Sequence, residues 1–96
     1  MASLGKIPVF SGEDYTYWKV RMRAFLQSMG AEVWDITKNQ AYEVLAFRTS
    51  PLQVSEHEAN AKAINALFAG VSHAELSRVQ GFQEAHNAWT CLENYQ

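Results

Sequence analysis

The stretch FSGEDYTYWKVRMRAFLQSM, residues 10–29, carries the strongest structural signal in this 96-residue chain. Its apolar residues recur at steps of three and four, the spacing that places side chains on one face of an α-helix. These residues are Tyr15, Trp18, Met22, Phe25, Leu26 and Met29. The pattern predicts an amphipathic helix whose apolar stripe forms one side of a core.

Both ends of this helix have signals of their own. Ser11 and Asp14 have the spacing of a capping box, with Ser11 as the N-cap residue. Phe10 precedes that cap and Tyr15 follows it, so the two side chains are placed to pack as a hydrophobic staple. Gly30 stands where a glycine in the left-handed conformation commonly ends a helix.

The segments around this helix are less regular. Residues 1–9 contain a glycine and a proline and have no helical period, so we expect an extended N-terminal arm that delivers Phe10 to the core. Residues 31–36 predict a short helix that packs Trp34 beside the first helix. Residues 37–54 contain a Thr-Ser-Pro break and predict a connector anchored by aromatic residues.

Two further serines are followed three positions later by an acidic residue, which predicts two more helix starts. Ser55 with Glu58 predicts a helix that Gly70 ends, with Ala63, Ile64, Leu67 and Phe68 on its apolar side. Ser72 with Glu75 predicts a short helix to about residue 79.

A last helix is expected over residues 83–95. Its inward face comprises Ala85, Ala88, Trp89, Leu92 and Tyr95. No segment combines alternating polarity, β-branched residues and hairpin turn chemistry, so no strand is expected. Residues 1–96 are therefore predicted to form a single all-α domain, a compact bundle of about five helices around one core.

Composition and charge narrow the function classes. The net charge of -2 argues against a simple nucleic-acid-binding protein, because phosphate binding depends on clustered Lys and Arg. Lys19, Arg21 and Arg23 are the candidate interaction surface, although a solvated helix face explains them more simply. One cysteine, no export signal and no long apolar run predict a protein that stays off membranes and works in the cytoplasm or nucleus.

The sequence lacks the usual arrangements for catalysis or metal binding. His57, His73, His86 and Cys91 are scattered, and His86 and Cys91 are expected at the surface or half buried. We therefore expect no enzymatic activity, no metal and no cofactor.

The three tryptophans are the other residues that could mark a site. A large aromatic at helical spacing belongs to a core more often than to a ligand site. We expect Trp18 and Trp89 in the core and Trp34 half exposed.

Several of these residues form a motif. Phe10, Gly12, Tyr15, Trp18 and Met22 resemble the F-x-G-x-x-Y-x-x-W opening of Gag polyproteins from copia-type LTR retrotransposons, especially those of plants. Later segments are similar to the same family: VWDI with Trp34, EANAKAINALFAGV with Ile64, and EAHNAWTCLENY with Trp89 and Leu92. The likeness extends from about residue 7 to residue 95.

The resemblance implies a retroviral-capsid-like N-terminal lobe, an all-helical unit that self-assembles into a shell around RNA. It also implies that the motif residues are architectural. The family's second helical lobe and CCHC zinc knuckle are not among these residues, so RNA packaging is not expected from them alone.

Three functions remain open. The leading expectation is a structural Gag protein that acts through protein–protein contacts and self-assembly. The alternative is a domesticated lobe that holds a peptide or partner protein in a groove between helices. A weaker third possibility is direct RNA binding through Lys19, Arg21 and Arg23.

Overall fold

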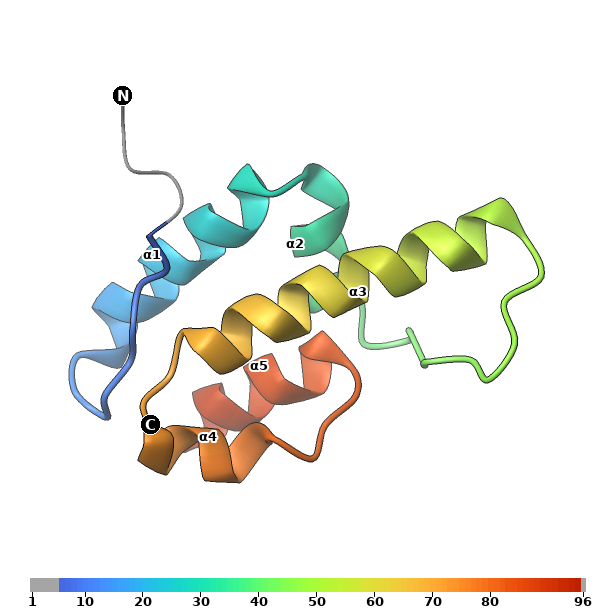
Figure 1. Ribbon diagram of the computed structural model, residues 1–96. Coiled ribbons are helices and arrows are strands. Elements are labelled where there is room, and N and C mark those ends of the chain that lie inside the picture. The colour runs from blue at the N-terminus through green and yellow to red at the C-terminus, as the bar shows by residue number, and fades with distance from the viewer. Residues whose placement is uncertain (1–5, 96) are drawn as a thin grey trace.

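A computed structural model describes residues 6–95 and arranges them in five helices (Figure 1). These are α1 (Tyr15–Ser28), α2 (Ala31–Lys38), α3 (Pro51–Ala69), α4 (His73–Val79) and α5 (Ala85–Asn94). The long α3 runs through the middle of the molecule, with α1 and α2 on one side and α4 and α5 on the other (Figure 1). The all-α prediction is confirmed.

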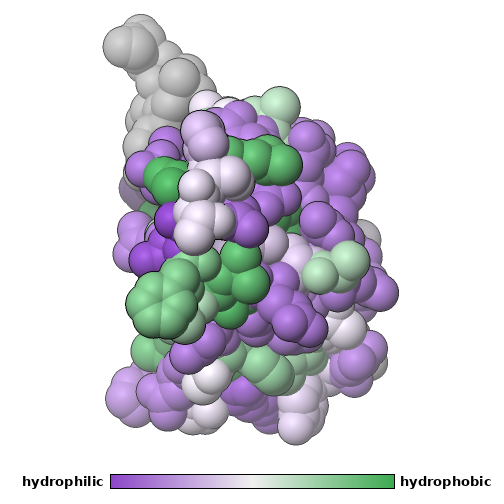
Figure 2. Space-filling model, turned by 90° about the vertical axis from the view of Figure 1, so that its right-hand side faces the viewer, coloured by the Kyte–Doolittle hydropathy of each residue, from purple (hydrophilic) through white to green (hydrophobic). Residues whose placement is uncertain are grey.

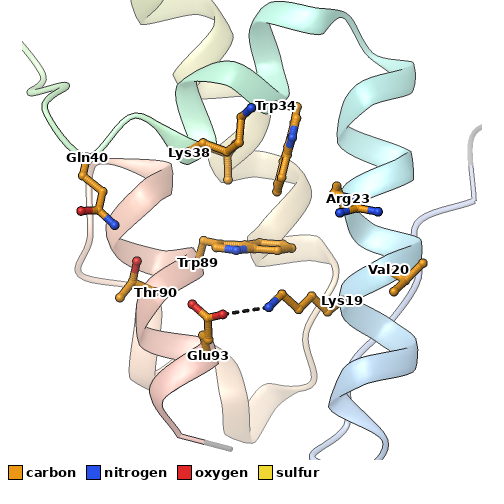
Figure 3. Close-up of a pocket in the computed structure, with 10 residues that line it drawn as sticks. Lys19, Val20, Arg23, Trp34, Lys38, Gln40, Trp89, Thr90 and Glu93 are labelled. Atoms are coloured by element: carbon orange, nitrogen blue, oxygen red, sulfur yellow. Dashed lines mark hydrogen bonds and ion pairs between the residues drawn. The ribbon is translucent and has the colours of Figure 1, made fainter.

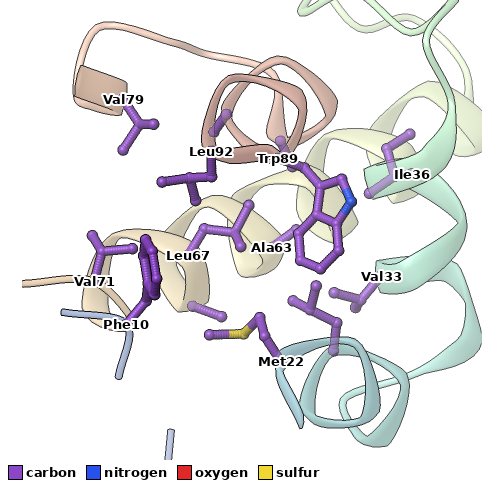
Figure 4. Close-up of a cluster of buried hydrophobic side chains, with 14 of the residues drawn as sticks. Phe10, Met22, Val33, Ile36, Ala63, Leu67, Val71, Val79, Trp89 and Leu92 are labelled. Carbon is purple, nitrogen blue, oxygen red and sulfur yellow. The ribbon is translucent and has the colours of Figure 1, made fainter. Parts of the chain in front are cut away.

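The core forms where α3 meets its neighbours. Met22 and Leu26 from α1, Val33 from α2, Leu67 from α3 and Leu92 from α5 are fully buried. In Figure 4 the side chains of Met22 and Val33 converge with those of Leu67 and Leu92 from opposite sides of the bundle. The α3 face toward them is lined by small alanines, so the neighbouring helices can approach closely. The apolar stripe predicted for the first helix is therefore correct.

The N-terminal arm lies beside the end of α3. Phe10 donates its backbone N–H to the Gly70 carbonyl at 2.8 Å, and its own carbonyl accepts from Ser72 N at 2.8 Å. The indole N–H of Trp18 donates to the Pro8 carbonyl at 3.1 Å, so the first helix holds the arm in place. A Cβ at Gly70 would overlap the Met22 methyl group, which explains why a glycine stands there. Residues 1–5 of the predicted arm lie outside the described residues.

The predicted N-cap at Ser11 is wrong. The helix begins four residues later, with Asp14 as its N-cap in the left-handed conformation (φ 55°) and no side-chain capping bond. Gly12 also has a positive φ of 97°, so the chain turns sharply before the helix starts. This turn brings the Phe10 ring to 5.5 Å from the Tyr15 ring, which is the contact expected of the pair. Gly30 has φ 135° and precedes α2, and it does not adopt the left-handed C-cap conformation.

The predicted N-cap at Ser55 is also wrong, because α3 begins at Pro51. Ser50 is the N-cap: its hydroxyl accepts from Gln53 N at 3.1 Å, and Gln53 Oε1 accepts from Ser50 N at 3.3 Å. Proline is favoured at the first helical position, where its missing N–H costs nothing. The predicted connector over residues 37–54 therefore shortens to residues 39–50, since α2 continues to Lys38.

The C-terminal third departs from prediction in three details. Ser72 is at the N-cap of α4 but makes no side-chain capping bond, and Glu75 instead pairs with Arg78 at 3.1 Å. The last helix is shorter than residues 83–95, and Tyr95 is 60% exposed and not inward. Its ring lies 4.4 Å from the Arg78 guanidinium, a contact that keeps it at the surface.

Candidate functional site

The motif residues form one continuous aromatic cluster. The Trp18 ring lies 5.3 Å from Phe10 and 5.7 Å from Tyr15, and it stacks on Trp89 at 5.8 Å. Trp89 in turn meets Trp34 edge to face at 5.3 Å. Trp18 and Trp89 are buried and Trp34 is half buried, as predicted. The cluster therefore connects the N-terminal arm to the surface at Trp34.

The other motif residues are also structural. Met22 and Leu92 are fully buried, and Ile64 is partly buried against the core. A Cβ at Gly12 would lie 3.3 Å from a Glu75 carboxylate oxygen, which leaves little room for any side chain at that turn.

A groove opens between α1, α2 and α5, where the aromatic cluster reaches the surface (Figure 3). We call it the tryptophan groove; its volume is about 320 Å³. The indoles of Trp34 and Trp89 project into the space between α1 and α5. The lining residues are Lys19, Val20, Arg23, Trp34, Thr37, Lys38, Gln40, Trp89, Thr90 and Glu93.

The predicted basic surface is divided by this groove. Lys19 and Arg23 are four residues apart on α1 and both line it, whereas Arg21 does not. The guanidinium of Arg21 instead lies 5.4 Å from the Tyr17 ring. The three cations predicted from the sequence therefore do not form one surface. Lys38 of α2 lines the groove together with Lys19 and Arg23.

The groove cations differ in how they are partnered. Lys19 Nζ pairs with Glu93 at 2.8 Å and thereby links α1 to α5 (Figure 3). Lys38 lies 3.9 Å from Asp35 in an exposed pair, which contributes little, and it also lies over the Trp34 ring at 5.8 Å. Arg23 has no ion pair among residues 6–95.

Tyr15 lies beneath one end of the Lys19–Glu93 pair. Its hydroxyl is buried and has no hydrogen-bond partner within the described part of the chain. Burial, with a smaller contribution from the Glu93 carboxylate, raises the pKa of Tyr15 to about 12. The phenol therefore stays protonated at physiological pH.

A second surface lies at the far end of α3. Phe47 is 84% exposed and Leu52 is 68% exposed, and Leu45 and Val54 beside them are also exposed. We call these four residues the connector patch. Figure 2 faces this end of the molecule and shows several hydrophobic side chains exposed between polar ones. A hollow of about 230 Å³ adjoins it, lined in part by Leu52.

The connector, which carries Leu45 and Phe47 of this patch, is tethered at the start of α5. Val44 N donates to a Glu84 carboxylate oxygen at 3.0 Å, and the Tyr42 carbonyl lies 2.9 Å from His86 Nε2. His86 is buried, which corrects the expectation of a surface or half-buried side chain. Tyr42 is also buried, so one of the expected aromatic anchors is present. The patch is therefore held on an ordered segment.

Asn60 forms a further polar link that periodicity does not reveal. Its amide donates to the Gln83 carbonyl at 2.7 Å and accepts from Ala85 N at 2.8 Å. This side chain, buried within α3, thus fixes the start of α5. The sequence did not single this residue out, because α3 contains a second asparagine, Asn65.

Two classes of site have no counterpart in the described residues. Residues 6–95 contain no group of three or more His, Cys, Asp or Glu side chains arranged to hold a metal ion. None of their helices combines the length and apolar composition needed to cross a bilayer. Cys91 is half buried, as expected, with its sulfur 3.7 Å from the Arg78 carbonyl.

Comparisons with protein-family models, with curated protein sequences and with solved structures found no match.

Proposed function

We propose that this chain is a structural protein of the Gag capsid type, which acts by contact between copies of itself and not by chemistry. The connector patch is the observation that carries the proposal. Exposed apolar side chains that gather over one region mark contact sites, and these four lie within ten positions of one another. Leu52 and Val54, two apart on α3, point in different directions, so Phe47 and Leu52 are the main contact residues. The copia-type motif supports the same reading, since its residues are used inside the domain and leave the outer surfaces for contacts.

The size of the patch sets the expected strength of the contact. Fully burying one Phe or Leu side chain contributes roughly 1.5 to 3 kcal/mol, whereas association costs about 4 kcal/mol or more in lost freedom. Phe47 and Leu52, at roughly 3 to 6 kcal/mol together, match only the low end of that cost, and Leu45 and Val54 add less because they are already more than half buried. We therefore expect weak, concentration-dependent self-association.

Light scattering across a concentration series tests the proposal. The average mass of the wild-type protein should rise with concentration, and Phe47→Asp should abolish the rise. Val9→Asp is the matched control because Val9 is 62% exposed but lies in the N-terminal arm, away from the patch. A wild-type protein that stays monomeric at every concentration would refute the proposal.

A partner-binding module is the second candidate, and the tryptophan groove favours it. Direct RNA binding is weaker, because Lys19 is paired with Glu93 and Arg21 lies away from the other cations. We propose that the protein works without enzymatic activity, metal or cofactor. We also propose that it is located in the cytoplasm or nucleus.

A further inference from the structure

The tryptophan groove has an excess of positive charge in a chain whose net charge is negative. Lys19, Arg23 and Lys38 line it against one carboxylate, Glu93, while the whole sequence carries a net charge of -2. The Lys19–Glu93 pair at 2.8 Å neutralises one of the three cations. Arg23 has no ion pair among the described residues, and Lys38 has only the exposed 3.9 Å pair with Asp35, so these two cations remain to meet an anionic group, one from each side of the groove.

Between these cations the groove has an apolar floor. Trp34 and Trp89 supply it, and Val20, which is 53% exposed, forms part of the α1 wall. Gln40 and Thr90 line the same space and offer side-chain hydrogen-bonding groups. A floor of this kind with a few polar groups is typical of ligand sites, and a volume of about 320 Å³ is enough for a short segment of chain.

We propose that the tryptophan groove binds a short acidic segment of a partner protein. One apolar side chain of the segment rests on Trp34 and Trp89, and flanking carboxylates pair with Arg23 and Lys38. Arginine suits this role because its planar guanidinium can accept a carboxylate in a bidentate manner. The proposal does not depend on self-association, since no residue of the connector patch lines the groove.

The aromatic geometry favours a peptide over a single-stranded nucleic acid. Binding of bases requires open aromatic faces on which they can stack. Trp89 is only 8% exposed and is stacked on Trp18, while the Lys38 ammonium group lies over the Trp34 ring. By contrast, an aliphatic or aromatic side chain of a peptide needs contact only with the edges of the two indoles that remain accessible.

Fluorescence anisotropy with defined probes tests the proposal. The probe is a fluorescein-labelled hexapeptide Asp-Glu-Leu-Phe-Asp-Glu, amidated at its C-terminus. Three labelled controls separate the contributions: Lys-Lys-Leu-Phe-Lys-Lys reverses the charge, Asp-Glu-Ser-Gly-Asp-Glu removes the apolar pair, and oligouridine of the same length replaces the peptide. The protein is used below the concentration at which it self-associates.

The matched variants are Arg23→Glu and Arg21→Glu, which change the same residue type on the same helix inside and outside the groove. We expect Arg23→Glu to weaken binding of the acidic apolar peptide about tenfold or more, and Lys38→Glu to act in the same direction. Arg21→Glu should leave binding unchanged. Thermal melting checks each fold, and Arg23→Gln replaces the reversal if that variant melts early.

Four results would overturn the proposal. They are absence of binding, equal binding of the peptide that lacks the apolar pair, equal weakening by Arg21→Glu, and tighter binding of oligouridine with dependence on Arg23. The last result would assign the groove to nucleic acid.

Discussion

Replacing Trp18 by alanine should come close to unfolding the domain. The indole is 3% exposed, its ring contacts Phe10, Tyr15 and Trp89, and its N–H holds the arm through the Pro8 carbonyl at 3.1 Å. Truncating a buried Trp typically costs about 3 to 5 kcal/mol, and a domain of this size has about 5 to 15 kcal/mol in total. A Trp18→Ala protein should therefore lose at least about a fifth of its stability, and all of it if the domain lies at the low end of that range.

Two further variants divide that loss into its parts. Trp18→Phe keeps much of the ring packing but leaves the Pro8 carbonyl buried without its donor, which should cost about 1 to 3 kcal/mol. Tyr17→Ala changes a neighbouring aromatic residue that is 59% exposed, and its effect should stay within about 0.5 kcal/mol.

Urea unfolding followed by circular dichroism measures the free energy of unfolding of all three variants. Self-association and binding of the acidic peptide should be measured on the same samples. The reasoning is refuted if Trp18→Ala stays within about 1 kcal/mol of the wild-type protein but loses either contact. The motif would then be a binding surface and not the support of the arm.

Four more substitutions test individual features. Ser50→Ala should cost about 1 kcal/mol of unfolding free energy because it removes the true cap of α3, whereas Ser55→Ala should change it by less than about 0.5 kcal/mol. Asn60→Ala should cost about 2 to 3 kcal/mol, since it leaves two backbone groups near α5 without partners, and an effect under about 1 kcal/mol would contradict the bonding described. Burial raises the pKa of Tyr15 in the folded state to about 12, above its ordinary value of 10.0, so the unfolded state ionises first. Stability should therefore be unaffected by Tyr15 below pH 10 and fall as pH rises from 10 to 12. Titrating Tyr15→Phe beside the wild-type protein should show a smaller fall, and identical pH profiles would contradict the burial of this phenol.

Local sequence signals predicted which segments are helical more accurately than they predicted the residues at which the helices begin. The apolar stripe of α1 was found because one face of a helix repeats every three to four residues. Ser55 and Glu58 matched a capping box as well as Ser50 and Gln53 did, and a proline taken as a break concealed the true start of α3. A four-residue motif alone could not separate these alternatives.

Contacts between distant segments were not predictable in this way. The bonds from Glu84 and His86 to the connector join residues about forty positions apart, and no periodic pattern records them. The same holds for the tryptophan groove, which draws Lys38 from another helix. The separation of Arg21 from Lys19 and Arg23 could have been foreseen, because residues two apart on a helix face different directions.

Hydrogen exchange at low and high protein concentration tests the central claim most directly, because it locates the contact between copies. We predict slower exchange at high concentration over residues 45–54, where the connector patch lies, with exchange in α1 unchanged. Phe47→Asp should remove the difference, and Val9→Asp should preserve it. Exchange that does not depend on concentration, or protection confined to α1 and α5 around the tryptophan groove, would contradict the claim.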